Sequence, residues 1–150
     1  EEITSYLEKI LRKEAGDGSG LIYGMGHAIY TKSDPRALIL KHAARPLAEQ
    51  TGYVKELDLL ESIERLVPDV FARVTGSDKT MCAYVDFYSG LVYTMLNIPQ
   101  EVFTPLFAIA RVAGWCAHRI EEVMTSNRII RPAYKSLTQR RTYVPMAKRE

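Results

Sequence analysis

Apolar residues recur every three or four positions along most of this chain, which is the spacing of one face of a helix. The pattern predicts helices over residues 2–14, 34–52, 53–76, 86–96 and 101–125. Between the first two, Leu21 to Tyr23 forms a short extended piece, too isolated to build a sheet. We therefore expect an all-α fold with little β-structure.

Glycine, proline and aspartate mark the expected ends of these helices. Asp34 is suited to cap a helix whose first residue is Pro35, and Gly52 is suited to end it. Pro46 is expected to kink or shorten this helix, and Pro68 to interrupt the next one, because proline lacks an N–H and clashes with the preceding turn.

The stretch from Val102 to His118 is apolar on nearly every side, which is typical of a central, buried helix. Arg111 is the only formally charged residue in that stretch. An unpaired buried charge would cost several kcal/mol or more, so Arg111 needs an anion. The helix pattern alone leaves open whether that anion is a carboxylate of the same protein or one of a ligand.

Composition narrows the class of protein. The chain has 150 residues, 47% apolar and 25% charged, with a net charge of +2, which is ordinary for a soluble globular domain. Near-balanced charge gives no reason to expect nucleic acid or an acidic membrane as partner. The chain has no membrane-spanning run, and its start has no targeting pattern.

The basic residues after Asn127 leave a nucleic-acid binder as a minor alternative, because acidic residues elsewhere balance them. Two distant cysteines, Cys82 and Cys116, argue against structural zinc and a disulfide-bonded secreted domain. We expect reduced thiols, a cytoplasmic protein and no metal.

The sequence from Gly24 to Arg36 has the most distinctive pattern. Two glycines one residue apart let the backbone turn sharply and expose its N–H groups, and His27 follows directly. Alone, G-x-G followed by histidine is usually just a turn. The run resembles the G-x-G-H-x-x-Y-x-x-x-D-P-R-A signature of citrate synthases, and three later stretches resemble that family in the same order. They are residues 85–90, 107–111 and 128–134.

The resemblance implies an all-α acyltransferase that condenses acetyl-CoA with oxaloacetate to citrate and CoA, the first step of the tricarboxylic acid cycle, with no cofactor. It assigns residues 1–92 to the small, CoA-binding domain and residues 93–150, with the helix 101–125 and the basic tail, to part of the large domain. The resemblance begins past the middle of the family, so the chain looks like a carboxy-terminal fragment. We expect it to be inactive alone, because the family's His-Gly-Gly segment precedes the matched region.

The resemblance also implies roles for individual residues. His27 matches the histidine that hydrogen-bonds the ketone oxygen of oxaloacetate, and Asp86 matches the aspartate that takes a proton from acetyl-CoA. The arginines that hold the substrate carboxylates are matched by Arg36, Arg111 and Arg131, the last reaching the partner subunit's site in a homodimer. The CoA-binding loop is matched by Leu21, Ile22, Tyr23, Gly24, Met25 and Gly26, and Lys32 is a candidate for a CoA phosphate.

Several alternatives stay open. From its position alone, Asp86 is more simply a helix cap, although its apolar neighbours predict a buried carboxylate and hence a stronger base. Ala83 and Tyr84 stand where family members often have Pro-Asn, and Thr31 stands where some have a basic residue. A 2-methylcitrate synthase that uses propionyl-CoA would share every motif, and a non-catalytic CoA-binding or oligomerisation module is a further candidate.

Overall fold

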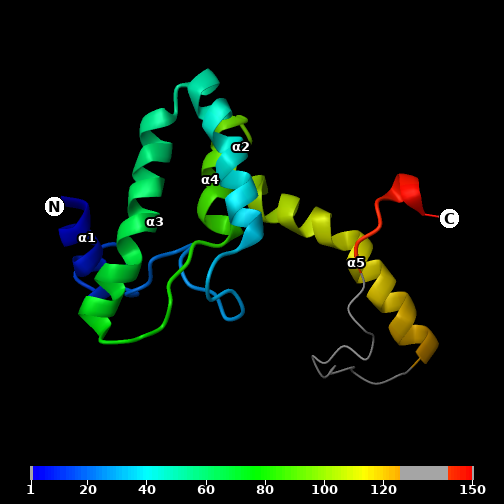
Figure 1. The fold of residues 1–150 in the computed structure, drawn as a ribbon, viewed down its shortest axis with the longest axis horizontal. Helices are drawn as coiled ribbons and strands as arrows, with labels where there is room; N and C mark the ends of the chain where they lie inside the picture. Colours follow the sequence, from blue (N-terminus) through cyan, green and yellow to red (C-terminus); the bar gives the residue numbers. More distant parts are fainter. Residues whose placement is uncertain (1, 126–141, 150) are drawn as a thin grey trace. The chain divides into compact units, whose positions relative to one another are not determined.

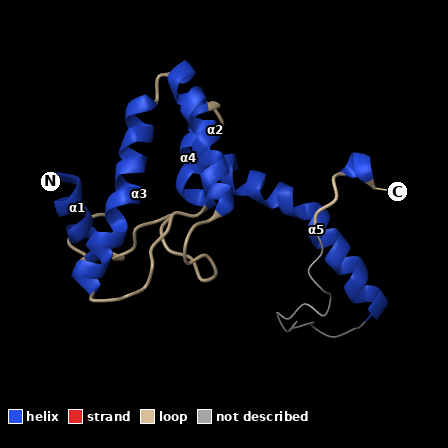
Figure 2. Ribbon diagram, viewed as in Figure 1, coloured by secondary structure: helices blue, strands red, loops and turns tan. Residues whose placement is uncertain are grey.

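The computed structural model describes residues 2–125 and 142–149, and in these residues it contains helices and no strand (Figure 2). The chain divides into two compact units, residues 1–107 and 108–150. The α-helices are α1 (Glu2–Leu11), α2 (Pro35–Thr51), α3 (Val54–Thr75), α4 (Val85–Met95) and α5 (Phe103–Thr125), with short 3₁₀ turns at Gln100–Val102 and Met146–Lys148 (Figure 1). The all-α prediction is confirmed.

The first unit consists mainly of two helix pairs. Helix α1 packs along α3, and α2 packs along α4 (Figure 1). Small residues on α2, Ala44 and Ala48, are fully or almost fully buried, which lets neighbouring helices approach closely. Leu57 and Val67 of α3 are completely buried in the same core. Burying one such side chain contributes about 1.5–3 kcal/mol, so this core stabilises the unit.

Helix α2 begins as the sequence predicts. Asp34 adopts an extended conformation and accepts a hydrogen bond from the Arg36 N–H at 2.9 Å, with Pro35 in the first turn. The predicted interruption at Pro68 is wrong, because α3 continues through it; α2 likewise continues through Pro46 to Thr51, and a kink there stays a prediction. Apolar packing of these helices outweighs the roughly 3 kcal/mol that an internal proline costs.

Helix α4 begins without a side-chain cap of its own. Its N-cap residue is Tyr84, and Asp86 lies inside the first turn, so the capping interpretation of Asp86 is wrong. The first N–H of the helix, from Val85, is instead bound by Oδ2 of Asp34 at 3.0 Å. A single carboxylate therefore caps both α2 and α4.

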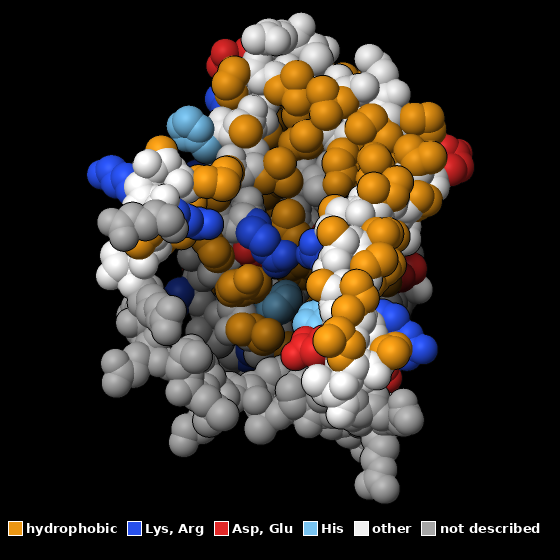
Figure 3. All heavy atoms as spheres, turned by 90° about the vertical axis from the view of Figure 1, so that its right-hand side faces the viewer, with side chains coloured by type: hydrophobic (Ala, Val, Ile, Leu, Met, Phe, Trp, Pro, Cys, Tyr) orange, Lys and Arg blue, Asp and Glu red, His pale blue; other side chains and the backbone are white. Residues whose placement is uncertain are grey.

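Helix α5 differs from the expectation of a buried helix. None of its residues is buried by the described part of the chain, and Ile109, Trp115 and Met124 are more than half exposed. Figure 3 shows apolar side chains exposed over much of one face of the molecule. The prediction of a buried helix is thus wrong for the described residues, although Phe103 at the start of α5 contacts Tyr93.

No helix among the described residues is long and apolar enough to cross a membrane. The division into domains at residues 92 and 93 stays a prediction.

Candidate active site

The turn that carries His27 is attached directly to the start of α4. The N–H of Gly26 donates to the Cys82 carbonyl at 2.8 Å, and the N–H of Tyr84 donates to the Gly24 carbonyl at 3.0 Å. Met25 and Ala83 form an isolated antiparallel bridge between these bonds. Two segments far apart in the sequence are thereby held in register just before α4.

The two glycines are required by this attachment. Gly24 and Gly26 both have φ near +80°, a conformation that other residues adopt only with strain. A Cβ at Gly24 would lie 2.7 Å from Cα of Phe87, and one at Gly26 would lie 2.8 Å from Sδ of Met81. The predicted exposure of the turn's N–H groups is wrong at two positions, because the Met25 and Gly26 N–H groups donate to backbone carbonyls.

The half-buried His27 ring is held by backbone amides. Its Nδ1 accepts from the N–H of Ile29 at 3.0 Å and lies 3.3 Å from the N–H of Tyr30. Because Nδ1 uses its lone pair as an acceptor, the proton of the neutral ring is on Nε2. The ring also contacts Tyr30 and Tyr84, with ring centroids 4.8 and 5.7 Å away. His27 is therefore arranged to donate a hydrogen bond through Nε2.

Arg36 lies against Tyr30, which contacts this histidine, and is held by the fully buried Asp34. Its Nε and Nη2 donate to the two carboxylate oxygens at 3.0 and 2.9 Å, and its guanidinium lies 5.5 Å from the Tyr30 ring centroid. The hydrogen bonds from Arg36 hold the pKa of Asp34 below its ordinary value, against the effect of burial. The ion pair does not use Nη1 of Arg36, whose side chain is 44% exposed.

Asp86 stands in the first turn of α4, two residues after Tyr84, which contacts His27. Its side chain is exposed, so the prediction of a buried carboxylate is wrong for this chain. The charge of Asp86 adds to the larger effect of Asp34 in raising the pKa of Arg36. His27 thus contacts Tyr30, which lies against Arg36, and Tyr84, the N-cap of the helix that carries Asp86.

The expected CoA-binding loop lines a large apolar groove. Leu21, Ile22 and Tyr23 form part of its wall together with α1, α3 and Phe87, and its volume is about 780 Å³. Lys32 is exposed and lines a separate, smaller pocket of about 200 Å³.

The first unit, residues 1–107, does not contain the other two predicted arginines. Arg111 is exposed on α5 in the second unit, which does not support the argument from burial, and Arg131 falls outside the described residues. Sequence reasoning missed the part played by Asp34 at α4, and the contacts of Tyr30 and Tyr84. Tyr30 is part of the family signature, so the sequence could have indicated its role. The contacts of Asp34 with α4 and of Tyr84 with His27 join distant segments, and no local pattern predicts them.

In residues 2–125 and 142–149, no three His, Cys, Asp or Glu side chains are placed to hold a metal ion.

Comparison with known proteins agrees with this arrangement of motifs. The family model for the citrate synthase C-terminal domain matches residues 1–133. The citrate synthase of Synechocystis sp. is 39% identical over 150 residues, covering 99% of this chain and 35% of that protein. A citrate/2-methylcitrate synthase of Bacillus subtilis is 38% identical over 125 residues, covering 83% of this chain and 30% of that protein.

Solved structures give the same result. The citrate synthase of Thermoplasma acidophilum, in a ternary complex with carboxymethyl coenzyme A and oxaloacetate, is 34% identical with a TM-score of 0.61. The match covers 97% of this chain and 38% of that one. The chain spans about a third of the length of the curated relatives it matches. By its sequence and its structure, this chain belongs to the citrate synthase family.

Proposed function

We propose that this chain supplies part of the active site of a citrate synthase, which condenses acetyl-CoA with oxaloacetate to form citrate and CoA. The observation that carries the proposal is that His27 contacts both Tyr30, which lies against Arg36, and Tyr84, which begins the helix that carries Asp86. Because the chain spans about a third of its relatives' length, this activity is proposed for the whole protein.

In the proposed reaction, the carboxylate of Asp86 takes a proton from the methyl group of acetyl-CoA. The resulting carbon nucleophile attacks the ketone carbon of oxaloacetate, and a carbon–carbon bond forms while the ketone oxygen becomes an alkoxide. Nε2–H of His27 donates to that oxygen and stabilises its charge. Water then cleaves the thioester, which releases CoA and citrate.

Three arginines are proposed to hold the carboxylates of oxaloacetate, since a guanidinium offers two parallel donors to a carboxylate. Arg36 would act from the position fixed by Asp34, using the part of its guanidinium that the ion pair leaves. Arg111 and Arg131 are assigned by the resemblance, with Arg131 reaching the partner subunit's site in a homodimer. The loop from Leu21 to Gly26, with Lys32, is proposed to bind CoA.

The proposal also specifies acetyl-CoA as the acyl donor. A relative that is named citrate/2-methylcitrate synthase matches this chain almost as well as the citrate synthases do, so propionyl-CoA is an alternative donor. A non-catalytic CoA-binding or oligomerisation module is the alternative from another class. Cytoplasmic location and a reaction without a cofactor stay predictions.

A chimera tests the catalytic proposal. In it, residues 1–150 replace the segment of the Synechocystis enzyme to which they align. We expect CoA release with acetyl-CoA and oxaloacetate, and Asp86→Asn should lower kcat by roughly two orders of magnitude or more while leaving KM nearly unchanged. A folded chimera with no turnover would contradict the proposal, and near-normal kcat in the variant would remove Asp86 as the base. Comparing acetyl-CoA with propionyl-CoA identifies the donor.

The same chimera tests Arg111. If Arg111 binds a carboxylate of oxaloacetate, replacement by leucine should raise KM for oxaloacetate strongly with little change in melting temperature, because a contact with the substrate is lost. A large loss of stability with unchanged KM would show that Arg111 serves an internal ion pair instead.

A further inference from the structure

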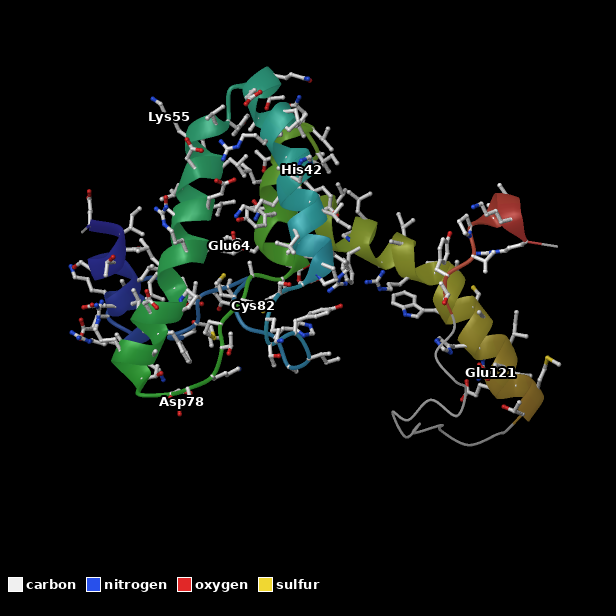
Figure 4. The ribbon with its side chains drawn as sticks, viewed as in Figure 1. His42, Lys55, Glu64, Asp78, Cys82 and Glu121 are labelled. Atoms are coloured by element: carbon white, nitrogen blue, oxygen red, sulfur yellow. The ribbon has the colours of Figure 1, made fainter. Side chains whose placement is uncertain are left out.

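Glu64 connects the two helix pairs of the first unit. It lies on α3, between that helix and the α2–α4 pair (Figure 4). Its Oε2 accepts a hydrogen bond from Oη of Tyr88, on α4, at 2.6 Å. The same oxygen accepts from Nζ of Lys41, on α2, at 2.5 Å. One carboxylate oxygen thus binds both members of the α2–α4 pair to α3.

Among the described residues, the carboxylate of Glu64 is the only hydrogen-bond partner of the buried Tyr88 hydroxyl. The side chain is 0% exposed, and the ammonium of Lys41 lies 5.7 Å from its ring centroid. Burial and the hydrogen bond to Glu64 both raise the pKa of Tyr88, so the hydroxyl stays a donor at neutral pH. A buried hydroxyl without a partner is costly, and this favours the one rotation of α4 that brings Tyr88 to Glu64.

That rotation also determines where Asp86 points. Successive residues of an α-helix are about 100° apart, so Asp86 and Tyr88 lie about 200° apart around α4. Tyr88 is turned into the core, and Asp86 is correspondingly exposed on the other side of α4, which begins directly after the residues bonded to the His27 turn. A change in the rotation of α4 would move Asp86 and strain the bonds of Gly24 and Gly26 to residues 82 and 84.

We propose that Glu64 is a positioning residue, which orients Asp86 and the His27 turn by holding the hydroxyl of Tyr88. The effect of Glu64 on catalysis rests on the proposed citrate synthase function, whereas its effect on the position of α4 is independent of that function. Lys41 donates to the same carboxylate and holds it in place. The cluster does not touch the substrate in this assignment and acts through α4.

The alternative is that the ion pair of Glu64 with Lys41 only stabilises the fold and does not affect the position of Asp86. The chain contains a matched control for it, because Glu8 of α1 forms an ion pair with Arg73 of α3. The two glutamate side chains are similarly exposed, 26% for Glu8 and 23% for Glu64, and both join helices of the same unit. Glu8 has no contact with α4 among its described ion pairs and hydrogen bonds.

The first test uses hydrogen exchange on the 150-residue chain. Glu64→Leu should speed exchange of the α4 amides and of the Gly26 and Tyr84 N–H groups roughly tenfold or more, because their support is lost. Glu64→Gln should change them much less, since an amide oxygen still accepts from Tyr88. Glu8→Leu should affect α1 and leave α4 unchanged. If Glu64→Leu leaves these N–H groups as protected as Glu8→Leu does, the positioning role is refuted.

The second test uses the active chimera, well below its melting temperature. Glu64→Leu and Tyr88→Phe should each lower kcat roughly tenfold to a hundredfold with KM for oxaloacetate nearly unchanged, and the double variant should be no slower than Glu64→Leu. Glu64→Gln should retain most of kcat. Unchanged kcat in Glu64→Leu, or additive losses in the double variant, would refute the inference. An inactive parent chimera would instead count against the proposed function, while the exchange test would still decide the positioning role.

Discussion

Replacing Asp34 by alanine should destabilise this chain more than any exposed polar substitution, because its buried carboxylate has partners in two helices. The change removes the cap of α2, which is worth about 1 kcal/mol. It leaves the part-buried Val85 N–H without an acceptor, at about 1–3 kcal/mol. The Arg36 side chain is 44% exposed and can be solvated, so its lost ion pair adds only about 0–1 kcal/mol. We expect a total of about 2–5 kcal/mol.

Urea unfolding of the 150-residue chain, followed by circular dichroism, measures this loss. The control is Asp17→Ala, which removes an aspartate that accepts from the Ser19 N–H and the Tyr23 hydroxyl in an exposed loop. We expect the control to cost about 0.5 kcal/mol or less. Equal losses for the two variants would refute the argument that Asp34 supports both helices.

The pH dependence of the free energy of unfolding gives a second check on the role of Asp34. Hydrogen bonds from Arg36, and those from the backbone, lower the pKa of Asp34 below its ordinary value of 3.8. The unfolded chain then binds this proton more readily than the folded one, so the stabilisation is complete above pH 3.8 and is lost as pH falls through the folded value. Asp34→Asn should therefore flatten the loss of stability in acid, and a parallel acid dependence in the variant would contradict this cause.

Three further predictions concern the stability and association of the chain. Gly24→Ala should lower the free energy of unfolding by about 2 kcal/mol more than Gly52→Ala. Both glycines have φ near +80°, but only a Cβ at Gly24 would collide with another segment, so equal losses would contradict this reasoning. Tyr88→Phe should weaken the alkaline loss of stability, since burial raises the pKa of Tyr88 and stability falls as pH rises above about 10; melting curves across pH measure it. The isolated chain should self-associate through the apolar side chains of α5, and light scattering that gives a concentration-independent monomer mass would oppose this.

The helices could be predicted from the sequence because their signals are local. The cap and proline at Asp34 and Pro35 and the glycine at position 52 mark the ends of α2 within one residue. Pro68 misled the prediction because the local cost of a proline is visible in the sequence, whereas the burial of Val67 and Val70 on the same helix is not. The burial predicted for α5 failed because an apolar helix reveals that it needs a partner but not whether the same 150 residues supply one.

The candidate site was predicted as a set of residues but not as an arrangement. The signature includes His27, Tyr30 and Arg36, and Tyr30 contacts both of the others. Nothing local indicates that the carboxylate of Asp34 caps a helix 51 residues away, or that the glycine turn bonds to residues 82 and 84. These long-range bonds determine the orientation of Asp86. Substitutions of Asp34 and Glu64 therefore test the position of Asp86, whereas substitution of Asp86 itself tests its proposed chemical role.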